Sequence, residues 1–132
     1  MRPLPILHAV LSTVLAAGLV GQVFLAGLGV FDSPAQFATH RDVGYGLSGI
    51  ALLVIVTAAL SRAGRAPIGA AGLVFLLFIV QSILVTMRTS QPAIAALHPV
   101  NGFLILLLSL WIARMAWAKA REGTPAASGS LA

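Results

Sequence analysis

The stretch APIGAAGLVFLLFIVQSILVTM, from Ala66 to Met87, contains no charged residue. An α-helix rises about 1.5 Å per residue, so about 20 apolar residues cross a hydrocarbon core about 30 Å thick. Comparable apolar runs precede and follow this one along the chain, at 6–31, 36–60 and 93–117. The sequence therefore predicts an integral membrane protein with four spans.

The composition of the whole chain agrees with this interpretation. Of its 132 residues, 59% are hydrophobic and 8% are charged, and the mean hydropathy is +1.02. Ordinary soluble domains have about 25% charged residues. Four spans leave no room for a separate soluble domain, so we expect residues 1–120 to form one transmembrane domain. The remaining tail, 121–132, is small and polar, and we expect it to be disordered in the cytoplasm.

Three short polar segments, FDSPAQ (31–36), SRAGRAP (61–67) and RTSQP (88–92), separate the spans. Connections this short make consecutive helices antiparallel neighbours. The predicted fold class is therefore all-α, an integral membrane up-down-up-down four-helix bundle. In such a bundle the second and fourth spans run in the same direction at diagonal corners, and their inward side chains face each other across the core.

The formal net charge of +5 comes from basic residues near the ends of spans. Such placement is typical of membrane orientation signals, whereas a nucleic-acid partner would call for one interleaved basic patch. Arg41 and Arg88 lie on one side, and the other side carries Arg2, Arg62, Arg65, Arg114, Lys119 and Arg121. The positive-inside rule therefore predicts a multi-pass protein of the bacterial cytoplasmic (inner) membrane with both termini in the cytoplasm.

The first apolar run also has features of a secretory signal peptide, because a basic residue precedes it. The run is about twice as long as a typical signal core, which favours a retained first span. The chain has no cysteine. A disulfide, a thiolate metal site and an iron–sulfur cluster are therefore excluded.

The two halves of the chain repeat one spacing of polar residues. Gln22 is followed 18 residues later by His40, and Gln81 is followed 17 residues later by His98. This match within one residue indicates a duplicated helical hairpin. Both histidines come near the beginnings of spans that run from outside to inside, so we expect them at similar depth near the outer face.

Each histidine is followed four residues later by a glycine, Gly44 or Gly102. Residues four apart share a helical face, and glycine has no Cβ, so a flat cofactor could approach the backbone there. Ser48 continues the face of the second span. Histidine is costly in a bilayer and is a common axial ligand of haem iron. The pattern predicts one b-type haem with His40 and His98 as its metal ligands.

Further side chains are candidates for contacts with this haem. Gln22 and Gln81 lie on the spans that precede the two histidines. Arg41 and Arg88 could pair with the haem propionates near the N-termini of the second and fourth spans, and Arg88 lies two helical turns after Gln81. A stripe of small residues on the first span, at positions 18, 22, 26 and 29, could admit a wide cofactor.

These stretches resemble the four-helix b-type haem membrane proteins, and most closely one half of the haem A synthase architecture. FATHRDVGYG (37–46) is similar to that family's His-Arg stretch at the start of a second span. VQSILVTMR (80–88) and IAALHPVNGFLILLLSLWIAR (94–114) are similar to its third and fourth spans. The layout also resembles that of small bacterial four-span membrane proteins. The resemblance covers about residues 7–117, and it implies that the two histidines are axial ligands.

The chain departs from that family in two respects. Haem A synthase has two such bundles and a glutamate one turn before the second-helix histidine, whereas this chain has one bundle and Gln36. A haem with two histidine ligands has no open position for oxygen or substrate. We therefore expect a small membrane cytochrome for electron transfer or haem handling, with a redox or haem-transfer protein as partner, and no catalytic residue of its own.

Other interpretations of the same residues stay open. His40, His98, Gln22 and Gln81 could be structural side chains that hydrogen-bond neighbouring helices, and the glycines of the first span could serve close helix packing. The protein would then be a non-catalytic membrane accessory or interaction subunit. A small transporter is disfavoured because no acidic residue lies deep inside a span. His8 has no histidine partner at its depth, and we interpret it as interfacial or hydrogen-bonded.

Overall fold

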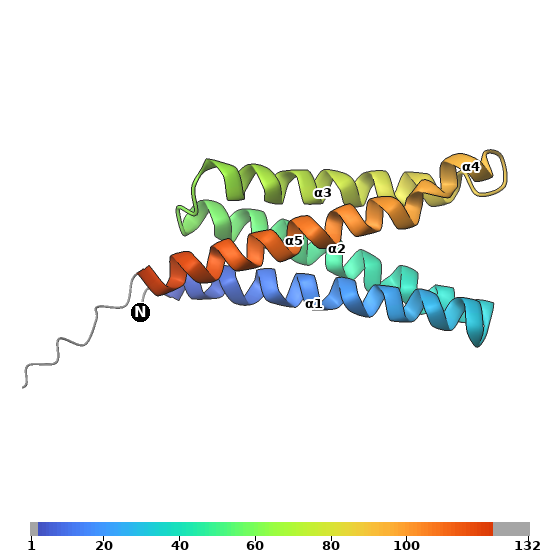
Figure 1. Cartoon of the computed structure of the whole chain (residues 1–132), viewed down its shortest axis with the longest axis horizontal. Helices are drawn as coiled ribbons and strands as arrows, with labels where there is room; N and C mark the ends of the chain where they lie inside the picture. The colour runs from blue at the N-terminus through green and yellow to red at the C-terminus, as the bar shows by residue number, and fades with distance from the viewer. Residues whose placement is uncertain (1–2, 123–132) are drawn as a thin grey trace, which may run out of the picture.

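The computed structural model describes residues 3–122, and all regular structure in that range is helical. Four long helices, each antiparallel to its neighbours along the chain, make up the bundle in Figure 1. They are α1 (Pro3–Phe31), α2 (Phe37–Leu60), α3 (Arg65–Thr86) and α5 (Leu97–Glu122), with the 3-10 helix η1 (Pro34–Gln36) and the short α4 (Pro92–Ala95) in the connections. The predicted all-α four-helix bundle is confirmed.

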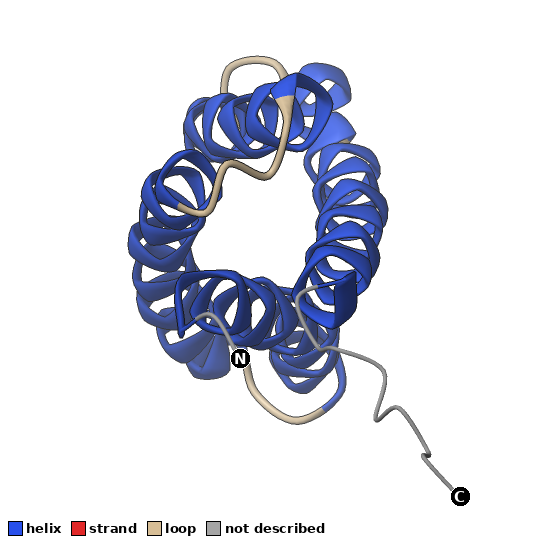
Figure 2. Ribbon diagram, turned by 90° about the vertical axis from the view of Figure 1, so that its left-hand side faces the viewer, coloured by secondary structure: helices blue, strands red, loops and turns tan. Residues whose placement is uncertain are grey.

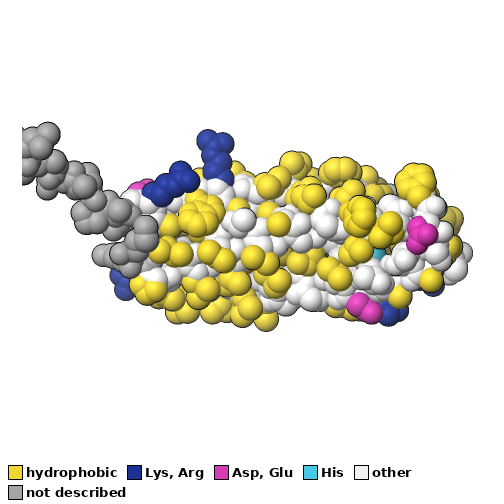
Figure 3. Space-filling model, turned by 90° about the horizontal axis from the view of Figure 1, so that it is seen from below, with side chains coloured by type: hydrophobic (Ala, Val, Ile, Leu, Met, Phe, Trp, Pro, Cys, Tyr) yellow, Lys and Arg dark blue, Asp and Glu magenta, His cyan; other side chains and the backbone are white. Residues whose placement is uncertain are grey.

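All four long helices are long and apolar enough to cross a membrane. They present large apolar side chains outward, such as Phe24, which is 67% exposed, and Leu107, which is 61% exposed. Figure 3 shows apolar side chains along the length of the bundle and basic ones near its two ends. A surface of this kind belongs in lipid, so the chain is a multi-pass membrane protein surrounded by a bilayer.

The fourth predicted span consists of two helices instead of one. α4 ends at Ala95 and α5 begins at Leu97. Pro99 has no N–H to donate to the carbonyl of Ala95, and its ring disfavours a continuous helix through this point. The break separates α4 from the long helix that carries His98.

Two further helix boundaries differ from the prediction. α1 begins at Pro3 instead of residue 6, as suits proline, which needs no hydrogen-bond partner in a first turn. α5 continues to Glu122, so the first two residues of the predicted disordered tail are helical. Lys119 and Arg121 lie in its last turn, where cations stabilise a helix C-terminus. The rest of that tail, 123–132, and Arg2 lie outside the described residues.

The long helices pack in the cyclic order α1, α2, α3, α5. The view along the bundle in Figure 2 shows the helices arranged as a ring. α2 and α5 therefore stand at diagonal corners and run in the same direction, as predicted. Their first turns lie together at one end, which we name the histidine end because it carries His40 and His98. Pro3 and Glu122 lie at the opposite end, which we name the terminal end.

An apolar core fills the middle of the bundle. It includes Leu15, Val54, Val74 and Ile105, one from each long helix and each 1% exposed. At the terminal end α1 and α5 lie together through small alanine side chains, which allow close backbone approach. Toward the histidine end α5 moves away from α1, so the α1–α2 hairpin and the α3–α5 hairpin diverge (Figure 1).

Two glycines of the first span pack against α2. A Cβ at Gly18 would overlap the side chain of Leu47, and a Cβ at Gly29 would lie 2.7 to 2.8 Å from ring atoms of Phe37. Side chains of α2 thus occupy the face that we expected to admit a wide cofactor. At these two glycines the structure shows close helix packing.

Candidate functional site

The two histidines singled out by the sequence meet across the bundle. His40 lies in the first turn of α2 and His98 in the first turn of α5, and both are half-buried. Their ring centroids are 6.2 Å apart, and the ring planes are inclined by 55°. Diagonal helices are the most distant pair in a four-helix bundle, so the two imidazoles bridge the core at the histidine end.

Each histidine is held by the backbone of the preceding long helix. Nδ1 of His40 lies 3.1 Å from the carbonyl oxygen of Gln22, and Nδ1 of His98 lies 3.2 Å from that of Gln81. A carbonyl oxygen only accepts hydrogen bonds, so these contacts assign the proton to Nδ1 in both rings. This tautomer leaves the lone pair of Nε2 available in both rings.

The glycines after the histidines face glutamine side chains. A Cβ at Gly44 would lie 3.6 Å from Oε1 of Gln22, and a Cβ at Gly102 would lie 3.4 Å from Nε2 of Gln81. In each hairpin, a glutamine amide of the preceding helix thus occupies the space that we expected for a flat cofactor. The two hairpins repeat both the histidine contact and the glycine contact, which is the physical basis of the matched spacing in the sequence.

Asn101 makes the two hairpins different. It is 7% exposed, and its Nδ2 donates to the carbonyl of Leu77 at 2.9 Å and to Oε1 of Gln81 at 2.6 Å. Val43 stands at the corresponding position of the other hairpin. There, Nε2 of Gln22 is buried and has no hydrogen-bond partner among residues 3–122. Gln22 therefore offers an unused donor inside the bundle, whereas the amide of Gln81 is tethered.

Replacing Asn101 with leucine is expected to lower the free energy of unfolding by about 1 to 2 kcal/mol, because interhelical hydrogen bonds in membranes contribute about 0.6 kcal/mol each and at most about 1.7. Denaturation of the protein in detergent micelles measures the change. Ser82→Ala is the control, since Ser82 donates only within α3, to the carbonyl of Phe78. Equal stability of the two variants would contradict the tether.

Phe37 also contributes to the site and is not among the residues predicted from the sequence. Its ring meets the His40 ring edge to face, with centroids 6.4 Å apart and planes at 89°. Because the same ring also packs on Gly29, Phe37 links the small face of α1 to the orientation of His40. The available signal is the spacing of three residues between Phe37 and His40, which puts both on one helical face.

Two side chains that we predicted to contact the cofactor form hydrogen bonds to nearby groups of their own helix. Nε of Arg41 donates to Oδ1 of Asp42 at 2.8 Å, and both side chains are more than 60% exposed. Oγ of Ser48 donates to the carbonyl of Tyr45 in its own helix at 2.7 Å. Neither side chain contributes a hydrogen bond to the histidine pair.

Arg88 does not share a helical face with Gln81. α3 ends at Thr86, so Arg88 lies in the turn beyond it, where it is exposed. The prediction that Arg88 continues the Gln81 face by two helical turns is therefore wrong. Two backbone contacts, from the N–H groups of Met87 and Arg88 back to carbonyls of the last turn, close the helix at this point.

His8 lies in the core near the terminal end. It is 1% exposed, and its Nδ1 lies 3.2 Å from Oγ1 of Thr57. The Thr57 hydroxyl donates to the carbonyl of Leu53 at 2.8 Å, so it accepts from His8. The hydrogen-bonded interpretation of His8 is confirmed, and burial excludes the interfacial one.

No cluster of three or more His, Cys, Asp or Glu side chains suited to a metal ion occurs in the part of the chain that the structure describes. The candidate site therefore offers two ligands from the protein. Two protein ligands suit a metal whose other ligands belong to a bound group, as the porphyrin nitrogens do for haem iron.

The fold and the site together define a class of protein, a four-span membrane bundle in which each hairpin presents one histidine to its partner across the core. Residues 22–88 match the family described as "Family of unknown function (DUF6220)". The match covers half of the chain, which therefore belongs to that family. It includes Gln22, His40 and Gln81, and it ends before His98. No curated protein and no solved structure matches the chain.

Proposed function

We propose that this protein is a small membrane cytochrome that binds one b-type haem between His40 and His98. The observation that carries the proposal is the ring-centroid separation of 6.2 Å. Two imidazoles that bind one metal from opposite sides, each through a nitrogen about 2 Å from the metal and about 1 Å from its own ring centre, have centres about 6 Å apart. The spacing of the pair fits an iron between the rings.

The hydrogen bonds of the pair also support haem binding. Metal-ligating histidines commonly donate their second ring N–H to a backbone carbonyl, which fixes the ring and strengthens the ligand. The contacts of His40 and His98 with the carbonyls of Gln22 and Gln81 are of this kind. The inclination of 55° between the rings is compatible with a shared metal, because an imidazole that held the metal through one nitrogen could rotate about that bond.

The surroundings of the pair offer a polar contact to a bound group. Gln22 has a buried N–H donor without a partner among residues 3–122, and a bound group could use it. When bound, haem supplies a one-electron iron couple. The chain orients the two imidazoles through backbone carbonyls, and His40 and His98 would hold the iron. The function that follows is electron transfer or haem handling with a protein partner, since a filled coordination shell does not favour stand-alone catalysis.

The same proposal includes an orientation in the bacterial cytoplasmic membrane. Within residues 3–122, the histidine end carries Arg41, Arg88, Asp32 and Asp42, and the half nearer the terminal end carries Arg62, Arg65, Arg114, Lys119, Arg121 and Glu122. The excess of cations toward the terminal end supports a cytoplasmic position for it. The histidine pair then lies near the outer face.

A haem titration tests the proposal. The full-length protein, purified in detergent, is titrated with haem and monitored by absorbance. We expect a reduced-minus-oxidised spectrum of b type that saturates at one haem per chain, because the chain has one pair of facing histidines. A protein that stays colourless after expression with haem supplied, and that shows no saturable spectrum in the titration, would overturn the proposal.

A second candidate function is a non-catalytic accessory subunit, and the same hydrogen bonds favour it. Histidines that donate to the carbonyls of Gln22 and Gln81 join α1 to α2 and α3 to α5 even without a cofactor. Interhelical bonds of this kind stabilise membrane bundles. The titration separates the two functions, because a structural pair gives no haem spectrum.

A further inference from the structure

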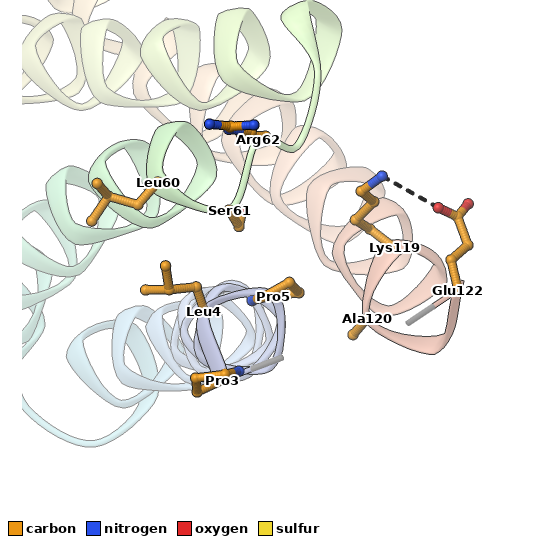
Figure 4. A pocket seen from close by; sticks show the side chains of 9 residues that line it. All are labelled: Pro3, Leu4, Pro5, Leu60, Ser61, Arg62, Lys119, Ala120 and Glu122. Atoms are coloured by element: carbon orange, nitrogen blue, oxygen red, sulfur yellow. Dashed lines mark hydrogen bonds and ion pairs between the residues drawn. The ribbon is translucent and has the colours of Figure 1, made fainter. Parts of the chain in front are cut away.

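A pocket opens at the terminal end, on the opposite side of the core from the histidine pair. Its volume is about 590 Å³. The first turn of α1, the turn between α2 and α3 and the last turns of α5 form its walls, as Figure 4 shows. Two cationic side chains, Arg62 and Lys119, contribute to its lining.

The backbone of Arg62 has a conformation that usually requires glycine. Its φ is +53°, in the left-handed region. The N–H of Arg62 donates to the carbonyl of Ala59, and the N–H of Ala63 donates to that of Ala58, which closes the end of α2. Glycine is the usual residue at such a helix end, so arginine destabilises this turn relative to glycine. The side chain that this backbone presents to the pocket is a guanidinium.

The pocket has both charged and apolar walls. Nζ of Lys119 lies 3.4 Å from Oε2 of Glu122, and the two side chains are 47% and 68% exposed. An exposed ion pair of this length is weak, so Lys119 can turn toward another anion. Leu4 and Leu60 line another part of the pocket and are 39% and 59% exposed. Two cations and one carboxylate leave a net positive charge beside an apolar surface.

We propose that this pocket binds the headgroup of an anionic phospholipid, with the phosphate between Arg62 and Lys119 and the acyl chains along Leu4 and Leu60. The pocket lies where the spans end, which is the level of the lipid headgroups. Arginine and lysine are the usual ligands of phosphate, and basic pockets between membrane helices recognise anionic headgroups. The proposal does not depend on haem binding.

Native mass spectrometry of the full-length protein in a neutral detergent tests the site. The protein is mixed with phosphatidylglycerol, with phosphatidylcholine or with inorganic phosphate. We expect one phosphatidylglycerol per chain to be retained, with at least about tenfold preference over phosphatidylcholine, because only the anionic lipid lacks a compensating cation in its headgroup. Inorganic phosphate should not compete at similar concentration, because it has no acyl chain for the leucine wall.

Two variants and a control locate the site. Arg62→Gly should lower the affinity for phosphatidylglycerol by about tenfold while leaving the protein folded, because glycine suits the backbone at this position. Lys119→Gln should have a similar effect without changing that turn. Arg114→Gln is the control, since Arg114 is an exposed cation of the same half of α5 that does not line the pocket.

Several results would overturn the proposal. One is equal binding of the anionic and the zwitterionic lipid. Another is undiminished affinity in both Arg62→Gly and Lys119→Gln. A loss in Arg114→Gln as large as that in Arg62→Gly would indicate general attraction to surface charge, and tight binding of inorganic phosphate would indicate a soluble anion as the ligand.

Discussion

On the proposed function, alanine at His40 or at His98 is expected to abolish the b-type spectrum and to lower the haem affinity of the protein by more than about 100-fold. Loss of a residue that merely supports a metal ligand costs about 10- to 100-fold in affinity, and loss of the ligand itself costs more. The rings are 6.2 Å apart on separate helices, so neither histidine can replace the other. The double variant should be colourless. Absorbance titration with haem measures the spectrum and affinity of the two single variants and the double variant.

Two controls separate ligand loss from loss of fold. His8→Ala removes a histidine that lies away from the pair and bonds to Thr57, so the spectrum should persist in the variant that remains folded. His98→Asn keeps a side-chain N–H that can donate to the carbonyl of Gln81, so it tests the structural role alone. A normal spectrum in the double variant, or an equal loss in His8→Ala, would contradict the assignment of ligands.

The bundle itself is predictable from the sequence for physical reasons. In lipid every backbone polar group must be satisfied within the protein, so an apolar run of sufficient length has few alternatives to a helix. The short connections then impose antiparallel neighbours and the diagonal position of α2 and α5. The predicted helix boundaries are less accurate, because single residues determine where a helix begins or ends. Pro99 breaks the fourth span, and Lys119 and Arg121 favour the continuation of α5 that the apolar run alone does not indicate.

The contacts that hold the two histidines are harder to predict from the sequence than the histidine pair itself. The sequence marks Gln22 and Gln81 by their side chains, yet their backbone carbonyls hold the histidines, and a carbonyl has no signature in a sequence. Gly44 indicates a close approach without indicating what approaches. The tether from Asn101 joins residues that are 20 positions apart, and its only sequence signal is a polar residue within an apolar run.

On the proposed function, leucine in place of Gly44 is expected to lower haem affinity by at least about tenfold. A Cβ at this position would lie 3.6 Å from Oε1 of Gln22, so alanine makes an ordinary contact. The further carbons of leucine extend beyond this contact, and we expect them to crowd the Gln22 amide. We expect them to displace the Gln22 amide or to separate α1 from α2, and either change would move the carbonyl that orients His40.

Gly46→Leu is the matched control for this prediction. Gly46 lies two residues further along α2, is exposed, and has no atom within 4 Å of the position of an added Cβ. Both substitutions replace a helical glycine and gain the same intrinsic helix propensity, about 0.8 kcal/mol. A difference between them therefore reports on the space beside Gly44 and not on the helix. Gly44→Leu should lose haem affinity and Gly46→Leu should keep it. Equal titration curves for the two leucine variants would show that the contact between Gly44 and Gln22 has no part in forming the site.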